Sequence, residues 1–71
     1  MVRLLDITKG DIYKFTSLDN SFGSKGKVVS LEDIIKINEK LLFKFNARGR
    51  TILADSSHYG VYWRLEYYLC Q

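Results

Sequence analysis

The chain has 71 residues, 46% of them hydrophobic and 14% aromatic, and its 11 basic and 8 acidic residues give a formal charge of +3. A chain this short forms one domain and buries only about 60% of its unfolded surface, which argues against a large internal active-site cavity. The hydrophobic fraction excludes an intrinsically disordered chain, and the mild positive charge slightly favours polyanionic partners. We therefore expect one small domain over residues 1–71.

The single cysteine and the distribution of apolar residues indicate the compartment. Cys70 has no second cysteine with which to form an internal disulfide, which fits a reducing environment. The first seven residues include Arg3 and Asp6, unlike a signal peptide, and no stretch approaches the ~20 apolar residues that span a bilayer. The sequence predicts a cytoplasmic protein without membrane contact.

The first expected strand covers residues 12–16 and follows a turn at Gly10. Tyr13 and Phe15 share one face of this strand, because side chains alternate between the two faces of a sheet. Residues 17–26 are dominated by turn-forming residues and make the longest irregular segment of the chain.

The central segment, residues 27–45, fits two structures. Seven of the nine odd positions from 29 to 45 are apolar against three of the nine even positions from 28 to 44, which favours strands with a turn at Asn38-Glu39-Lys40. In the alternative, a helix over residues 30–42 is capped by Ser30 and packs on an antiparallel sheet, an α+β fold. We favour the strands because valine and isoleucine are frequent here.

The rest of the chain is predicted to form a hairpin and a final aromatic strand. Residues 41–45 and 50–54 are expected to pair around a turn at 46–49, and a loop at 55–60 leads into the last strand. Alternation in that strand predicts a core face of Val61, Trp63, Leu65, Tyr67 and Leu69, and an outward face of Tyr62, Arg64, Glu66 and Tyr68. About five short strands in so small a chain predict an all-β fold, a closed or nearly closed barrel that protects its edges.

Two stretches resemble a known family. Gly10-Asp11-Ile12 followed by Gly23-Ser24-Lys25-Gly26-Lys27-Val28-Val29 resembles the KOW motif and related SH3-like barrels. Small phage and prophage proteins with SH3-like barrels are similar in length and in the Lys-Gly-Lys-hydrophobic turn. The resemblance covers residues 8–32 and implies a five-stranded SH3-like barrel.

Catalytic and metal-binding patterns are weak. Asp55-Ser56-Ser57-His58 contains the residue types of a hydrolytic triad, but loop neighbours seldom reach the required geometry, so we interpret it as a turn in which Asp55 or Ser56 bonds to nearby main-chain amides. Residues 23–27 lack the spacing of a phosphate-binding loop, and His58 and Cys70 lack metal-ligand spacing. We expect a protein that is not an enzyme and has no metal or cofactor.

The basic residues favour nucleic-acid binding. Turns that meet at one end of a barrel would bring together a positive surface for phosphates, formed by Lys25, Lys27, Lys44, Arg48 and Arg50. Unpaired bases could stack on tyrosine rings, for which the candidates are Tyr13, Tyr59, Tyr62 and Tyr68. The ordinary alternative is that the charges form a solvated face and the rings fill the core.

A protein-binding surface is the alternative function. Tyr62, Arg64 and Tyr68 would form a small outward patch of residue types that are enriched at interfaces. Such a patch suits a phage-type module that binds and modulates a host protein, and the same face is a candidate for pairing two copies of the chain.

Overall fold

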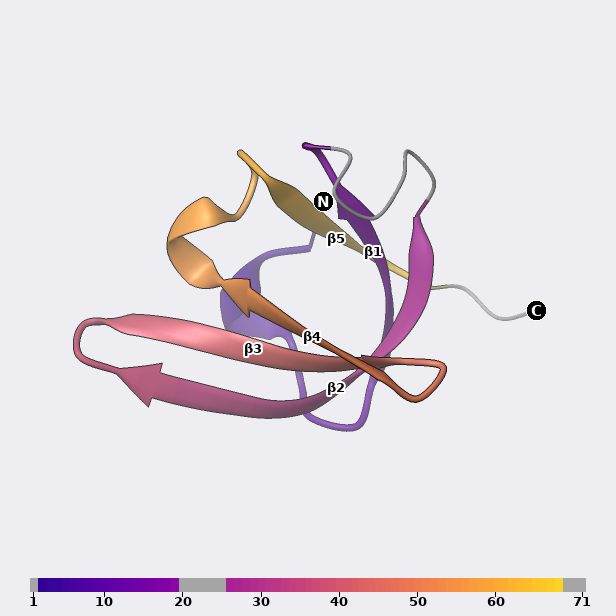
Figure 1. Ribbon diagram of the computed structural model, residues 1–71, viewed down its shortest axis with the longest axis horizontal. Helices are drawn as coiled ribbons and strands as arrows, with labels where there is room; N and C mark the ends of the chain where they lie inside the picture. Colours follow the sequence, from indigo (N-terminus) through magenta and orange to yellow (C-terminus); the bar gives the residue numbers. More distant parts are fainter. Residues whose placement is uncertain (1, 20–25, 69–71) are drawn as a thin grey trace.

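The chain folds into one antiparallel sheet of five strands in the order β4-β3-β2-β1-β5 (Figure 1). The computed structural model describes residues 2–19 and 26–68. Two short 3-10 turns, η1 (Leu4–Asp6) and η2 (Ser56–His58), accompany the strands, which are β1 (Ile12–Ser17), β2 (Lys27–Ile37), β3 (Lys40–Ala47), β4 (Arg50–Asp55) and β5 (Trp63–Tyr67). The all-β prediction is confirmed.

The central segment is strand, and the helical alternative over residues 30–42 is wrong. β2 pairs with β3 through a two-residue connection, with Ile37 opposite Lys40 and Ile35 opposite Leu42. A register shift between Leu31 and Asp33 interrupts the ladder, which is the behaviour of a β-bulge. Branched side chains suit this pleated surface, and β2 pairs with β1 over residues 27–30 and with β3 over residues 30–37.

The β3–β4 hairpin turns at Arg48 and Gly49, a narrower turn than the predicted 46–49. Both residues have positive φ, 53° for Arg48 and 86° for Gly49, as a two-residue turn between twisted antiparallel strands requires. Asn46 Oδ1 accepts a hydrogen bond from the Gly49 N–H at 3.0 Å, which fixes the turn. Ala47 and Arg50 flank it as a cross-strand pair.

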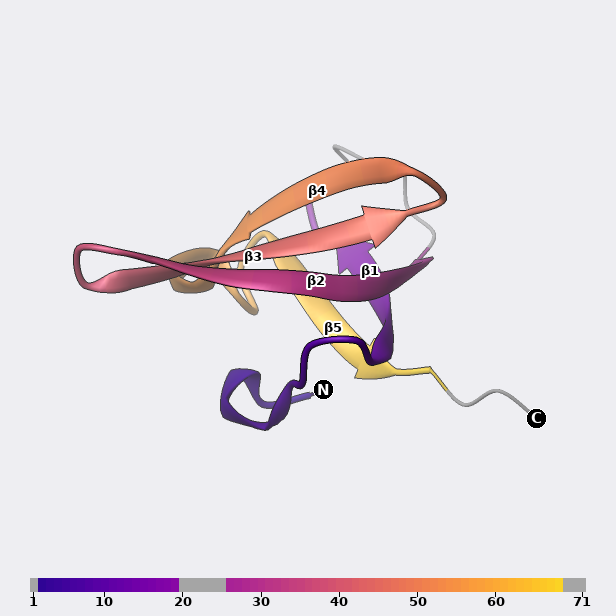
Figure 2. The same ribbon diagram turned by 90° about the horizontal axis from the view of Figure 1, so that it is seen from below.

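The core lies inside a curled sheet, with β1 and β5 on one side and β3 and β4 on the other (Figures 1 and 2). The indole of Trp63 lies at its centre, 5.5 Å from the ring of Phe15, 6.1 Å from Phe43 and 5.9 Å from Phe45. These rings come from three strands, so their packing holds the two halves of the sheet together. The remaining buried apolar residues are Val2, Ile7, Tyr13, Val29, Leu31, Ala47, Ile52, Ala54 and Leu65.

The predicted barrel does not close, because β4 and β5 do not pair. Residues 56–62, which form η2 and a turn with Gly60 at a φ of 83°, separate the two strands along the chain. One side-chain bond replaces the missing ladder: the Trp63 Nε1–H donates to the Asp55 main-chain oxygen at 2.8 Å. The sheet is therefore curled but open, and β4 and β5 remain its two edges.

The facing predicted for the last strand is partly wrong. Trp63 and Leu65 are buried as expected, but Val61 is 63% exposed and Tyr67 is 59% exposed. Val61 lies in the turn before β5, and Tyr67 pairs with Tyr13 at the end of the strand, where the core ends. Leu69 and Cys70 lie outside the described residues.

The N-terminal segment covers the free edge of β5 (Figure 2). The Val2 N–H donates to the Leu65 main-chain oxygen at 2.9 Å, and the Tyr59 hydroxyl donates to the Val2 oxygen. The same hydroxyl accepts from the Leu65 N–H at 3.3 Å. Both main-chain groups of Leu65 are thereby satisfied. Across residues 2–19 and 26–68, no helix has the length and apolar character needed to cross a bilayer.

Trp63→Ala is expected to lower the free energy of unfolding by about 3–5 kcal/mol, because it opens a cavity among the phenylalanine rings and removes the bond to Asp55. Denaturant unfolding followed by circular dichroism measures the change. Val61→Ala is the control two residues away, and its exposed side chain predicts a change near zero. Equal effects of the two substitutions would contradict the central position of Trp63.

Candidate functional site

A groove lies between the start of β2 and the β3–β4 turn. Its volume is about 780 Å³, and we call it the basic groove. Residues from three strands and the turn line it: Gly26, Lys27, Val28, Ala47, Arg48, Arg50, Thr51 and Ile52. The sheet order places β3 between β2 and β4, which brings these segments together although about twenty residues separate them along the chain.

The basic groove carries positive charge only. Lys27, Arg48 and Arg50 line it, and among the described residues no aspartate or glutamate does. Within the described part of the chain, neither arginine forms an ion pair. Guanidinium groups offer planar pairs of donors that match phosphate oxygens, so this arrangement suits an anionic ligand.

Of the other predicted cations, Lys44 lies away from the groove. Lys44 is opposite Asp33 on β2 and opposite Leu53 on β4, on the face of the sheet turned away from Phe43 and Phe45. Lys25 lies outside the described residues. Lys14 does not line the groove; its aliphatic stem lies against Gly26, so that a side chain at position 26 would collide with it.

A second, smaller cavity of about 120 Å³ lies at the other end of β4, in the gap between β4 and β5. Ile52 lines both this cavity and the basic groove. The ring of His58 meets the ring of Tyr62 edge-on at 5.0 Å on its rim. Two carboxylates, those of Asp19 and Asp55, also line it.

The four tyrosines proposed for base stacking divide into buried and exposed rings. Tyr13 is only 1% exposed, and its hydroxyl accepts from the Thr8 N–H at 2.9 Å, so its assignment as a stacking surface is wrong. Burial raises its pKa. Tyr59 is half-buried, and its hydroxyl holds the N-terminal segment to β5. Tyr62 is 50% exposed and Tyr68 42%.

The predicted protein-binding patch is divided. Arg64 lies on the outer face of β5, opposite Thr16, and its Nε is 3.4 Å from the Glu66 carboxylate. Tyr62 lies in the turn before β5, where its N–H donates to the His58 oxygen at 2.9 Å. Tyr68 follows the end of β5. The three side chains are exposed as predicted, but Tyr62 belongs with His58 and the second cavity.

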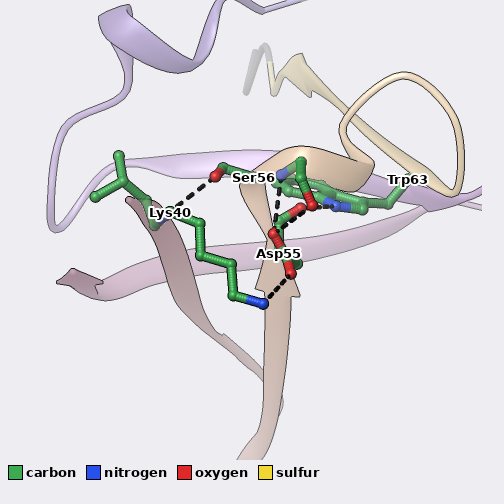
Figure 3. Close-up of polar contacts among 6 residues, drawn as sticks. Lys40, Asp55, Ser56 and Trp63 are labelled. Carbon is green, nitrogen blue, oxygen red and sulfur yellow. Dashed lines mark hydrogen bonds and ion pairs between the residues drawn. The ribbon is translucent and has the colours of Figure 1, made fainter. Parts of the chain in front are cut away.

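A polar cluster surrounds Asp55 (Figure 3), which is itself one of the residues that line the second cavity. The Asp55 carboxylate accepts from the Ser57 N–H at 2.9 Å and from the Ser57 hydroxyl at 2.8 Å, and it lies 3.2 Å from Lys40 Nζ. The Ser57 amide contributes most to lowering the pKa of Asp55 to about 2, and its hydroxyl and Lys40 add to the effect. The cluster connects the start of β3, the end of β4 and η2.

The triad-like sequence 55–58 is a structural turn, as predicted. Besides the bonds of Asp55, the Ser56 hydroxyl accepts from the Leu41 N–H at 3.1 Å. Across the ranges 2–19 and 26–68, no three metal-ligating side chains gather into a candidate metal site. These polar groups hold strand ends in place.

Comparison with known proteins gives no assignment. No protein-family model matches the chain, and neither the curated proteins nor the solved structures that were compared include a match.

Asp55→Asn is expected to flatten the dependence of stability on pH between about pH 4 and 2. The folded-state pKa of about 2 lies below the ordinary value of 3.8, so the unfolded chain binds the proton first as pH falls. The contribution of the carboxylate to stability is complete above about pH 4 and is lost toward pH 2. Urea unfolding at several pH values measures this slope.

Ser57→Ala provides a graded comparison, because it removes one of the two donors to Asp55 and leaves the carboxylate. Its slope should lie between those of the wild type and Asp55→Asn. Identical slopes for all three proteins would contradict the assigned role of the carboxylate.

Proposed function

We propose that the protein is a non-catalytic binding module whose basic groove binds the phosphate backbone of nucleic acid. The observation that carries this proposal is the convergence of Lys27, Arg48 and Arg50 on one groove, whose described lining residues include no aspartate or glutamate. Cations gathered in this way release condensed counterions from a polyanion when they contact its phosphates.

The properties of the hairpin turn support the proposal. Arg48 lies at the tip of the β3–β4 hairpin and Arg50 begins β4, so a turn fixed by the Asn46 bond presents both guanidinium groups. A rigid support reduces the entropy that is lost when the arginines bind a ligand. Phosphate contacts position a nucleic acid but carry no base information, so the groove alone predicts binding without strong sequence preference.

The SH3-like resemblance forms part of the proposal. β1 begins at Ile12, directly after Gly10-Asp11, and β2 begins at Lys27, within the stretch that resembles the KOW motif. This placement is compatible with the expected pattern. The protein-binding alternative has less support, because Arg64 is paired with Glu66 and Tyr62 faces His58.

Arg48→Ala combined with Arg50→Ala is expected to weaken binding and to make its salt dependence shallower. Fluorescence anisotropy of a labelled oligonucleotide of about twelve nucleotides, titrated at several salt concentrations, measures both. Loss of two phosphate contacts should lower the slope of log K against log salt by about 1.4–1.8.

Arg3→Ala combined with Lys36→Ala removes the same charge outside the basic groove and serves as the control. It should change the affinity little and leave most of the slope. Absence of binding by the wild-type protein at ~20 mM salt, for single-stranded and duplex probes alike, would overturn the proposed function.

A further inference from the structure

We infer that the bound nucleic acid is single-stranded and runs along the free edge of β4, with phosphates at Arg48 and Arg50 and a base stacked on Tyr62. This inference rests on the proposed function of the basic groove and names its ligand class. Three neighbouring features carry this inference. The basic groove lies at the start of β4, the open edge of β4 follows it, and the exposed ring of Tyr62 lines the second cavity at the end of β4.

The edge of β4 is open between Arg50 and Asp55. The Asp55 oxygen is bonded to the Trp63 indole outside the β3 ladder. Main-chain groups of alternate residues point to the same side in an antiparallel strand, so those of Thr51 and Leu53 point to the free edge. Within residues 2–19 and 26–68, these groups have no main-chain partner beyond the ladder.

The middle of the other edge strand, β5, is occupied by contrast. Both main-chain groups of Leu65 on β5 are bonded, to Val2 and to the Tyr59 hydroxyl, and the Trp63 oxygen accepts from the Gly60 N–H. The outward groups in the middle of β4 have no such main-chain partner among the described residues. Outward N–H groups next to arginines are suited to phosphate oxygens, and the outward carbonyls can accept from base amino groups.

The two cavities form a path along this edge. Arg50 and Thr51 line the basic groove, Leu53 and Asp55 line the second cavity, and Ile52 lines both. Five residue steps of extended strand from Arg50 to Asp55 span about 17 Å. An extended chain laid along β4 would contact both cavities at once.

The charged residues along this path indicate which end binds a phosphate and which end binds a base. The groove end holds Arg48 and Arg50, whereas the far end is lined by the acidic residues Asp19 and Asp55, the latter paired with Lys40, so the guanidinium groups favour a phosphate at the groove end. Tyr62 stands at that far end with half of its surface exposed. The rings of His58 and Tyr62 are nearly perpendicular, with centroids 5.0 Å apart, a contact that restricts the movement of the tyrosine ring.

A duplex cannot make these contacts together. Its bases are paired and stacked on one another, so none is available to the Tyr62 ring unless the duplex opens. Unpaired bases stack readily on aromatic side chains, and every base offers such a face. The structure therefore favours single strands, through arginine and amide contacts at one end of β4 and through stacking at the other.

The first experiment compares Tyr62→Ala and Tyr62→Phe by anisotropy with two probes, an oligo-dT of about twelve nucleotides and a duplex of about twelve base pairs. Tyr62→Ala should weaken single-strand binding by about fivefold or more and leave duplex binding unchanged, whereas Tyr62→Phe should keep the wild-type affinity. Tyr68→Ala, an exposed tyrosine beyond the end of β5, is the matched control and should change neither.

The second experiment tests the edge of β4 directly. Leu53→Pro removes an outward N–H without removing a donor to β3, and Leu53→Val keeps the N–H with a comparable apolar side chain. Single-strand affinity should fall only with proline, in a variant whose thermal unfolding shows that it still folds. Oligo-dT should also slow hydrogen exchange of the Thr51 and Leu53 amides in the wild-type protein.

The outcomes separate the two proposals. Binding that requires Arg48 and Arg50 but is equally tight for duplex and single strand, and is insensitive to Tyr62→Ala, overturns the single-strand inference and leaves the basic groove intact. Unchanged exchange at Thr51 and Leu53 with bound oligo-dT also overturns the path along β4. Failure of both probes to bind at ~20 mM salt overturns the proposed function itself.

Discussion

The packing of Trp63 is the interaction on which the rest of the structure depends. A chain of this length has little apolar surface to bury, and one indole contacts phenylalanines from β1 and β3 while its N–H satisfies the end of β4. This single residue joins the two halves of the curled sheet where no ladder does. Trp63 also lines the second cavity, which lies in the gap between β4 and β5. The residue that fills the centre of the core therefore forms part of the wall of this cavity.

The two edge strands of the sheet, β4 and β5, differ in how many hydrogen bonds their outer main-chain groups receive. Val2 and the Tyr59 hydroxyl bond to Leu65 in the middle of β5, whereas among the described residues the outer edge of β4 receives the indole bond at its last residue and no main-chain bond. Natural sheets protect exposed edges with charge, and β4 has Arg50 at its start and follows Arg48 in the turn. The same charges that discourage pairing with another strand produce the positive groove.

Local patterns in the sequence predicted most of the strands and little of their assembly. Alternation located β1 to β5 within a few residues, and Gly49 marked the tight turn. The closed barrel was wrong, because closure depends on how residues 56–62 place β5 against β4, which no short-range pattern encodes. The burial of Tyr13 and the position of Lys44 away from the basic groove follow from the sheet order and the register, which local patterns do not encode. Arg48 and Arg50 could be predicted as part of the basic site from the sequence, because they lie in and directly after one hairpin turn.

The turn itself has an evolutionary consequence. Arg48 holds a φ of 53°, a left-handed conformation in which side chains other than asparagine, aspartate and glycine are disfavoured by about 1–2 kcal/mol. Selection for thermal resistance alone would place glycine or asparagine there, and the guanidinium would be lost. At position 48, the conformational stability of the turn and the positive charge of the surface therefore favour different residues. We expect more thermostable forms of this protein to replace Arg48 by glycine or asparagine.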